Sequence, residues 1–257
     1  MGFKPGKQFK NLRTNNKKSI NADWLNPQLD SSRRPRVGTL NSRLTYNKFH
    51  EMWITSEYAP MQNPTEFIWL LEKLSKYQPI ESMIEIGIAK GGTLLFWNEF
   101  LESGSKYYGL DLRNEINWNY WDSDIDIDIT IGNTHDEQIY QKFKEKLNGK
   151  KVDFLFHDGD HSPDGAKQDI EWYGSFVKDG GIIAIQDTRL IRSWWDDITG
   201  SGINATHPRL GIPVDINRQE TDIFVKEEFK TDQGTGIIYK IPGQTIVKFR
   251  DDLNETK

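Results

Sequence analysis

Residues 63–188 form alternating apolar and polar blocks, each about the length of a helix or a strand. Short apolar runs, typical of parallel strands buried on both faces, occur at 83–87, 107–112, 152–156 and 182–185. Apolar residues at helical spacing occur at 63–77, 93–101, 135–147 and 164–178. Residues 125–131 alternate strictly, which predicts a half-exposed strand near the edge of a sheet. The order predicts βα units that form a mostly parallel sheet.

The end of the chain has a different pattern. A helix near 217–227 and two strands at 229–231 and 236–241 are expected, with Gly234 at the end of a hairpin turn. Parallel units followed by a hairpin predict an α/β, three-layer Rossmann-like fold with a seven-stranded, mostly parallel sheet and an antiparallel last strand. We expect two regions: a basic N-terminal arm over 1–55, extended or partly disordered, and a domain over 56–257.

Charge separates the two regions. Residues 1–50 contain eleven Lys and Arg against two Asp, a formal charge of +9, whereas the whole chain of 257 residues carries −5. The arm could therefore contact nucleic acid, an anionic partner or a neighbouring subunit in a homo-oligomer. It could equally be a solvated tail that wraps the acidic domain. We do not expect nucleic acid to be the partner.

Composition excludes several classes of site. The chain has no cysteine, which excludes disulfides, thiolate metal sites and cysteine nucleophiles. It has no apolar stretch of about 18 residues, so we expect no membrane span. The first residues have no apolar core of the kind a signal peptide needs. We therefore expect a cytoplasmic protein.

Two predicted strands end in aspartate. Asp158 follows the run at 152–156, and Asp187 follows the run at 182–185, with one predicted helix between them. A strand–helix–strand unit of this length is a right-handed crossover, so both strands run the same way. Asp158 and Asp187 should then lie at the same carboxyl edge, where open α/β sheets bind ligands.

A glycine-rich loop follows the first predicted strand and has the sequence Glu85-Ile-Gly-Ile-Ala-Lys-Gly-Gly-Thr93. A phosphate-binding P-loop needs Gly-Lys-Ser/Thr at its end, which this loop lacks. A dinucleotide loop needs a second glycine where this chain has Ala89. Asp111, at the end of the next strand, could bind the ribose of either a dinucleotide or another cofactor. S-adenosylmethionine, which carries no phosphate, suits the loop best.

Several motifs in this order resemble the class I S-adenosylmethionine-dependent methyltransferases. The motifs are Glu85-x-Gly87-x-x-x-Gly91-Gly92-Thr93, Gly109-Leu-Asp111, Asp158-Gly-Asp-His161-Ser162, Gly180-Gly181 and Gln186-Asp187-Thr188. Together with Gln62-Asn-Pro64-x-Glu66, they resemble more narrowly the branch of cephalosporin-hydroxylase-like proteins and macrolide-sugar O-methyltransferases. The resemblance covers roughly residues 60–241 and leaves out the N-terminal arm and the 189–214 insertion.

The resemblance implies a set of cofactor-binding residues. The methionine end of S-adenosylmethionine would lie against Gly87, Gly91, Gly92 and Thr93, with Glu85 beneath it. Asp111 would bind the ribose hydroxyls, Asn133 would lie near the adenine, and Asp158 could bind the cofactor's amine.

The resemblance also implies catalytic and metal-binding residues. Asp158, Gln186 and Asp187 occupy the positions that hold Mg²⁺ in the metal-dependent members, and His161 occupies the position of the proposed base, beside Asp158. Oxygen ligands suit Mg²⁺, and a bound metal lowers the pKa of a hydroxyl whose proton an imidazole can remove. Gln186 departs from the pattern because those members usually carry a carboxylate there, which leaves metal dependence open.

We therefore expect methyl transfer from S-adenosylmethionine to an oxygen of a small-molecule or sugar acceptor. The sequence leaves open whether Mg²⁺ assists this transfer. One alternative is an NAD-dependent dehydrogenase on a related sheet, and another is a non-catalytic module for cofactor binding or assembly. Four tryptophans could form a stacking lid over the acceptor, or could pack the arm or a subunit interface. They are Trp118, Trp121, Trp194 and Trp195.

Overall fold

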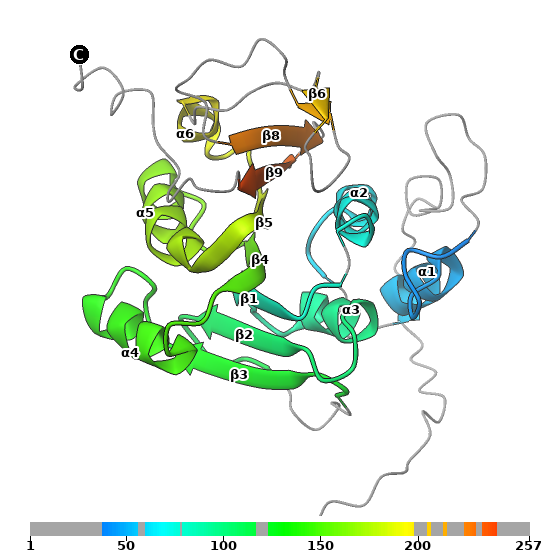
Figure 1. The fold of residues 1–257 in the computed structure, drawn as a ribbon, viewed down its shortest axis with the longest axis horizontal. Coiled ribbons are helices and arrows are strands. Elements are labelled where there is room, and N and C mark those ends of the chain that lie inside the picture. The colour runs from blue at the N-terminus through cyan, green and yellow to red at the C-terminus, as the bar shows by residue number, and fades with distance from the viewer. Residues whose placement is uncertain are drawn as a thin grey trace, which may run out of the picture.

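A computed structural model describes residues 38–55, 60–77, 79–116, 123–197, 205–206, 213–214, 224–229 and 233–240. These residues form a twisted central sheet with helices on both faces (Figure 1). The three-layer α/β fold that the sequence predicts is confirmed.

Seven strands form the sheet, in the order β3-β2-β1-β4-β5-β9-β8. The pairs β1–β2, β1–β4, β2–β3 and β4–β5 are parallel, whereas β9 is antiparallel to both β5 and β8. The last strand along the chain is thus the antiparallel one, as predicted. The strands are β1 (Ser82–Ile86), β2 (Lys106–Asp111), β3 (Asp126–Ile131), β4 (Val152–His157), β5 (Val177–Gln186), β8 (Phe224–Phe229) and β9 (Thr235–Lys240). Two short strands, β6 (Ala205–Thr206) and β7 (Pro213–Val214), pair separately.

The helices divide between the two faces of the sheet (Figure 1). On one face lie α1 (Tyr46–Thr55), α2 (Pro64–Ser75) and α3 (Gly92–Phe100), and on the other α4 (Glu137–Leu147), α5 (Pro163–Tyr173) and α6 (Arg192–Asp197). A 3-10 turn, Gly174–Phe176, follows α5. No helix in the described part of the chain has the length and the apolar run that a membrane crossing requires.

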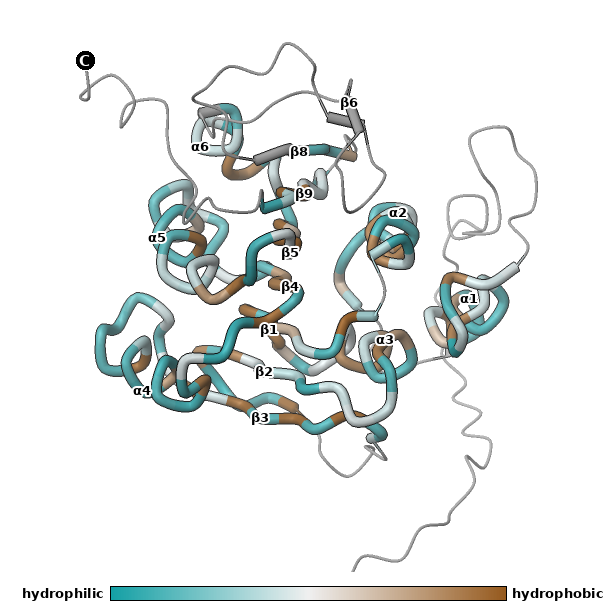
Figure 2. Tube along the Cα trace, in the orientation of Figure 1, coloured by the Kyte–Doolittle hydropathy of each residue, from teal (hydrophilic) through white to brown (hydrophobic). Residues whose placement is uncertain are grey.

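The short apolar runs form the middle of the sheet because both of their faces are covered. Along β4, Phe154 and Phe156 pack under α2 and α3, whereas Leu155 packs under α5 on the opposite face. Figure 2 shows the apolar residues gathered in the strands and on the helix faces that cover them. The strictly alternating strand β3 lies at the sheet edge with only Thr130 buried, as its pattern predicts. Burial of this kind contributes on the order of 2–3 kcal/mol for each large side chain.

The N-terminal region differs from the extended arm expected over 1–55. Residues 46–55 form α1, and four apolar side chains of this region belong to the core, each at most 8 % exposed: Leu40, Leu44, Phe49 and Trp53. The ring of Phe49 lies 4.9 Å from that of Phe96 on α3. Residues 38–55 are therefore part of the packed domain, and residues 1–37 lie outside the described residues.

The helix expected over 164–178 ends earlier, at Tyr173, and β5 begins at Val177. The pair Gly180-Gly181 therefore lies inside β5 rather than at the end of a helix. Val177 of β5 pairs with Val152 of β4, and Ile182 pairs with Phe154. Five residues of β5 therefore advance for every two of β4 in this stretch, which makes a bulge. Gly180 has a φ of +72°, and a Cβ on Gly181 would lie 2.8 Å from the carbonyl oxygen of Asp153. The glycines allow this bulge.

Two expectations for the C-terminal third were wrong. Residues 224–227, expected at the end of a helix, are in strand β8, because pairing with β9 overrides the local helical pattern; residues 217–223 lie outside the described range. Trp194 and Trp195 belong to α6, are 5 % and 2 % exposed, and pack in the core with residues of α5, so neither forms a lid. Trp118 and Trp121 lie outside the described residues.

Candidate functional site

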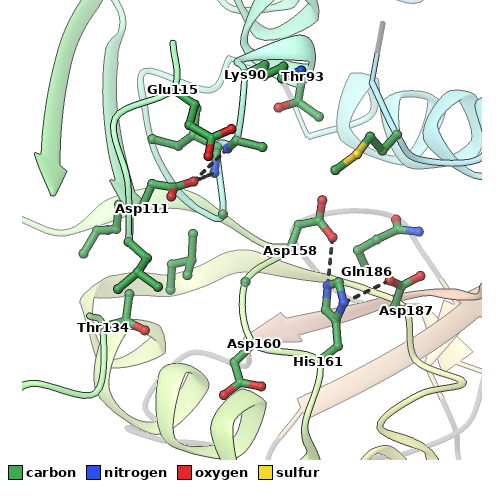
Figure 3. A pocket seen from close by; sticks show the side chains of 18 of the residues that line it. Lys90, Thr93, Asp111, Glu115, Thr134, Asp158, Asp160, His161, Gln186 and Asp187 are labelled. Atoms are coloured by element: carbon green, nitrogen blue, oxygen red, sulfur yellow. Dashed lines mark hydrogen bonds and ion pairs between the residues drawn. The ribbon is translucent and has the colours of Figure 1, made fainter. Parts of the chain in front are cut away.

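A cavity of about 1120 Å³ opens at the carboxyl edge of the sheet. Its walls come from the loops after β1, β2, β3, β4 and β5 and from the segment that precedes α2 (Figure 3). Pockets for a single small ligand measure about 300–1,000 Å³, so this cavity has room for a cofactor and an acceptor together. It lies where open α/β sheets bind ligands.

The glycine loop after β1 lies against the end of β4. Gly87 has a φ of +86°, and a Cβ at this position would lie 2.0 Å from the carbonyl oxygen of Asp158. Ala89 and Gly91 also have positive φ, 48° and 82°. A left-handed conformation costs a non-glycine residue about 1 kcal/mol, so Ala89 is held there by its surroundings.

Asp111 supports that loop from the end of β2. Its Oδ2 accepts hydrogen bonds from the backbone amides of Ile88, at 2.8 Å, and Ala89, at 2.7 Å. Its Oδ1 accepts one from the amide of Arg113, at 2.8 Å. Asp111 also lines the cavity, beside Glu115 (Figure 3). One carboxylate thus shapes the loop and faces the space where a ribose is expected.

Glu85 lies one layer below the cavity and is fully buried. It accepts hydrogen bonds from the hydroxyls of Thr93 and Tyr107. Burial raises the pKa of Glu85 to about 7, although these two hydrogen bonds oppose the shift. Glu85 therefore contacts Thr93, which lines the cavity, and not the cavity itself.

Asp158, His161 and Asp187 come together at the ends of β4 and β5. His161 Nε2 lies 3.3 Å from Asp158 Oδ1, and His161 Nδ1 lies 3.4 Å from Asp187 Oδ2 (Figure 3). The hydrogen bond with Asp158 raises the pKa of His161. Burial raises the pKa of Asp187. Asp158 and Asp187 thus lie at the same carboxyl edge of the sheet, as the sequence predicts, and the imidazole of His161 lies between them.

The backbone around Asp187 is strained and firmly held. Asp187 has a φ of +60°, which is rare for a residue other than glycine. The next residue, Thr188, donates its amide to the carbonyl of Gly234 at 3.0 Å and its hydroxyl to Glu228 at 2.7 Å. These bonds tie the loop after β5 to the β8–β9 hairpin. Strain of this kind is typical of functional sites, where it aims a side chain.

The donor set at this edge fits a divalent cation. Asp158, His161 and Asp187 each offer one ligand atom, and the three atoms lie within 4.8 Å of one another. Asp187 Oδ1 is buried without a hydrogen-bond partner among the described residues. The two carboxylates suit Mg²⁺, and the two carboxylates together with the imidazole suit a first-row transition metal.

Gln186, expected as a third metal ligand, has other partners. Its amide nitrogen donates to Glu66 Oε2 at 3.2 Å, and its amide oxygen accepts from the hydroxyl of Thr235 at 2.9 Å. Glu66 is fully buried on α2, and burial raises its pKa. The structure thus gives Gln186 hydrogen bonds that join β5, β9 and α2. Gln186 also lines the cavity beside Asp187, so its role as a third metal ligand stays a prediction.

Gln186→Glu should therefore lower the stability of the fold rather than simply strengthen a metal site. The substitution removes the donor to Glu66 and places two buried carboxylates in contact, at a cost of about 2 kcal/mol. Urea denaturation at neutral pH measures the loss. The double variant Glu66→Gln/Gln186→Glu restores one amide and one carboxylate, so it should recover most of the stability. Equal stability of Gln186→Glu and wild type would contradict this role.

Other residues of the cavity had no role assigned from the sequence, although Gln62 belongs to the Gln62-Asn-Pro64-x-Glu66 motif. Gln62 donates its amide nitrogen to Asp158 Oδ2, and Lys90 extends from the glycine loop. His135 lines the cavity beside Asn133, which was predicted there, and its Nε2 lies 3.3 Å from the fully buried Asp169. The signal for Lys90 lay in its glycine loop. None was available for His135, whose partner Asp169 comes from α5, 34 positions along the chain.

Comparisons with known proteins place this geometry among methyltransferases. Residues 84–188 match the sequence model of a family described as a methyltransferase domain. A sequence comparison with curated proteins finds no match. Among solved structures, the O-methyltransferase TomG from Streptomyces achromogenes is similar with a TM-score of 0.51 and 10 % identity, over 76 % of this chain and 86 % of TomG.

Two further structures have TM-scores just below 0.5. They are the MycE methyltransferase of the mycinamycin biosynthetic pathway (0.49, 16 % identity, 86 % of this chain) and an O-methyltransferase from Bacillus cereus (0.48, 15 % identity, 75 % of this chain and 90 % of that one). This chain spans 61 % of the length of MycE. The match to a methyltransferase domain thus covers residues 84–188, and the chain shares its fold with the O-methyltransferase TomG.

Proposed function

We propose that this protein transfers a methyl group from S-adenosylmethionine to an oxygen of a small-molecule or sugar acceptor. The proposal rests on one observation: three features lie together in the cavity at the ends of strands β1 to β5. These are the glycine loop, the acid at the end of β2, and the group formed by Asp158, His161 and Asp187. The match of residues 84–188 to a methyltransferase domain supports the same type of reaction.

The charge of the cavity favours this cofactor over NAD. Its described lining includes one lysine, Lys90, against five carboxylates: Asp111, Glu115, Asp158, Asp160 and Asp187. S-adenosylmethionine carries a positive sulfonium, which a surplus of carboxylates attracts. The pyrophosphate of NAD carries two negative charges, which the same surplus repels. This surplus argues against the dehydrogenase alternative.

The side chains at the edge can prepare an acceptor hydroxyl for methylation. His161 would take the proton from that hydroxyl, and Asp158 and Asp187 would fix the orientation of its ring and stabilise the imidazolium that forms. Bound S-adenosylmethionine supplies an electrophilic methyl group. Asp158 and Asp187 are also the residues whose oxygens would hold Mg²⁺, which would lower the pKa of the acceptor hydroxyl, and His161 would remain the base. MycE, solved with Mg and S-adenosylhomocysteine, offers a precedent for such a pairing.

Asp111→Asn tests the cofactor part of the proposal. The wild-type protein should bind S-adenosylhomocysteine, and the variant should bind it about 10-fold more weakly or worse, because a charged acceptor for ribose hydroxyls and loop amides is lost. Isothermal titration calorimetry measures both affinities. An exposed acid outside the cavity lining, Glu145 in the last turn of α4, provides the control Glu145→Gln, which should bind as wild type does.

Binding alone does not separate an enzyme from a non-catalytic module. A panel of hydroxylated small molecules and sugars, assayed with S-adenosylmethionine for release of S-adenosylhomocysteine, makes that distinction. Release that depends on an acceptor supports the proposed reaction. Tight binding of NAD with no binding of S-adenosylhomocysteine would instead revive the dehydrogenase alternative.

A further inference from the structure

Gln62 is a cavity residue whose side chain is held in one orientation. It lies between Pro60 and the start of α2, and its amide nitrogen donates to Asp158 Oδ2. The side chain of the next residue, Asn63, caps α2 by accepting a hydrogen bond from the backbone amide of Thr65 at 2.9 Å. The backbone amide of Asn63 donates to the side-chain oxygen of Gln233 at 3.1 Å. The backbone on the C-terminal side of Gln62 is thus fixed by two hydrogen bonds.

The hydrogen bond to Asp158 also settles which end of the amide faces where. A flipped amide would place its oxygen against a carboxylate oxygen, and two acceptors repel each other. The nitrogen therefore faces Asp158, and Gln62 Oε1 is the free acceptor. That oxygen is buried and has no hydrogen-bond partner among the described residues. A buried carbonyl without a hydrogen-bond partner destabilises the folded protein, and a bound donor would remove that cost.

The surroundings of Gln62 Oε1 indicate what kind of donor fits. Its neighbour Asp158 is a second acceptor, and a group with several N–H donors and a positive charge would satisfy both at once. Asp158 lies against the glycine loop, since a Cβ on Gly87 would touch its carbonyl oxygen. The pair formed by Gln62 and Asp158 is thus next to the loop where the methionine end of the cofactor is expected.

We propose that Gln62 binds the α-ammonium group of the cofactor's methionine part through its amide oxygen, while its amide nitrogen holds Asp158. This inference rests on the proposed function, because it assumes S-adenosylmethionine in the cavity. It adds a residue from outside the matched methyltransferase domain, which begins at residue 84. Gln62 thereby makes the segment before α2 part of the cofactor site.

The test compares S-adenosylhomocysteine with its analogue in which hydrogen replaces the α-amino group. Calorimetry gives the affinity of each ligand for wild type and for Gln62→Met, which keeps the length of the side chain and removes its polar atoms. Gln62→Met should lose about 10-fold in affinity for S-adenosylhomocysteine and clearly less for the analogue. Because Asp158 also faces the ammonium group, the same comparison is repeated in an Asp158→Asn background. A direct contact of Gln62 keeps its selectivity between the two ligands there, whereas an effect transmitted through Asp158 disappears.

Each outcome decides the inference. An equal loss for both ligands, or a selective loss that disappears in the Asp158→Asn background, would show that Gln62 only holds Asp158 and would overturn the proposed contact, with the cofactor assignment intact. Unchanged affinities together with a raised KM for the acceptor would place the amide at the acceptor and also overturn it. Wild-type protein that binds neither ligand would overturn the proposed function as well.

Two further variants guard against a folding artefact. Gln62→Asn keeps the amide but shortens the side chain by one methylene group, so it should lose the same selectivity between the two ligands. Gln141→Met, on the exposed face of α4, makes the same chemical change outside the cavity and should leave both affinities at the wild-type value. Thermal denaturation confirms that each variant is folded at the temperature of the titration.

Discussion

His161→Ala should lower the rate of methyl transfer by about 10²–10⁴-fold, the range typical of a lost general base. The imidazole lies between Asp158 and Asp187, so it can take a proton while two carboxylates stabilise the resulting cation. Cofactor affinity should change far less than the rate. Single-turnover assays with saturating S-adenosylmethionine measure the rate, and calorimetry with S-adenosylhomocysteine measures the affinity.

The control for this prediction is His50→Ala, on helix α1 and outside the cavity lining, which should keep the wild-type rate. Chelation of divalent metal then separates the two roles open to His161. A chelated enzyme with its full rate, combined with an inactive His161→Ala variant, indicates a general base that works without metal. A His161→Ala variant with the wild-type rate would show that the imidazole takes no part in the reaction.

The sheet and the position of the site could be predicted from the sequence because both depend on local patterns. Short apolar runs such as Val152–Phe156 are buried on both faces in any parallel sheet, and the crossover rule fixes the direction of the next strand. Those two facts are enough to bring Asp158 and Asp187 to one edge. The side chains then meet because β4 and β5 are hydrogen-bonded neighbours.

What the sequence could not predict depends on contacts between distant parts of the chain. The amide of Gln186 bonds to Glu66, 120 positions away, so its direction follows from how α2 packs and not from the Gln186-Asp187-Thr188 motif. Trp195 packs against Gly236, where any Cβ would meet its ring at 2.4 Å. A tryptophan next to glycine-rich, proline-rich sequence resembles a loop residue until its partner strand is known.

Glu85→Gln should remove a pH dependence of about 3 kcal/mol from the stability of the protein. Burial raises the pKa of Glu85 to about 7, from 4.5 in the unfolded chain. Between these pH values the unfolded state releases the proton and the folded state keeps it, so wild-type stability falls as pH rises. A shift of one pKa unit corresponds to about 1.4 kcal/mol, which gives the expected size. The amide that the substitution introduces does not titrate, and its oxygen can still accept from Tyr107.

Urea denaturation of wild type and Glu85→Gln from pH 4.5 to 8 measures this effect as a difference between two curves. The stability of wild type relative to the variant should fall by about 3 kcal/mol up to pH 7 and then level off, because both states are ionised above that pH. Tyr107→Phe removes a hydrogen bond that lowers the pKa of Glu85, so in this variant the fall should continue above pH 7. Parallel curves for wild type and Glu85→Gln would mean that Glu85 is ionised in the folded protein throughout. The carboxylate of Glu85, buried behind Thr93, would then carry a fixed negative charge. The cavity would be more strongly selective for a cationic cofactor than its lining residues alone imply.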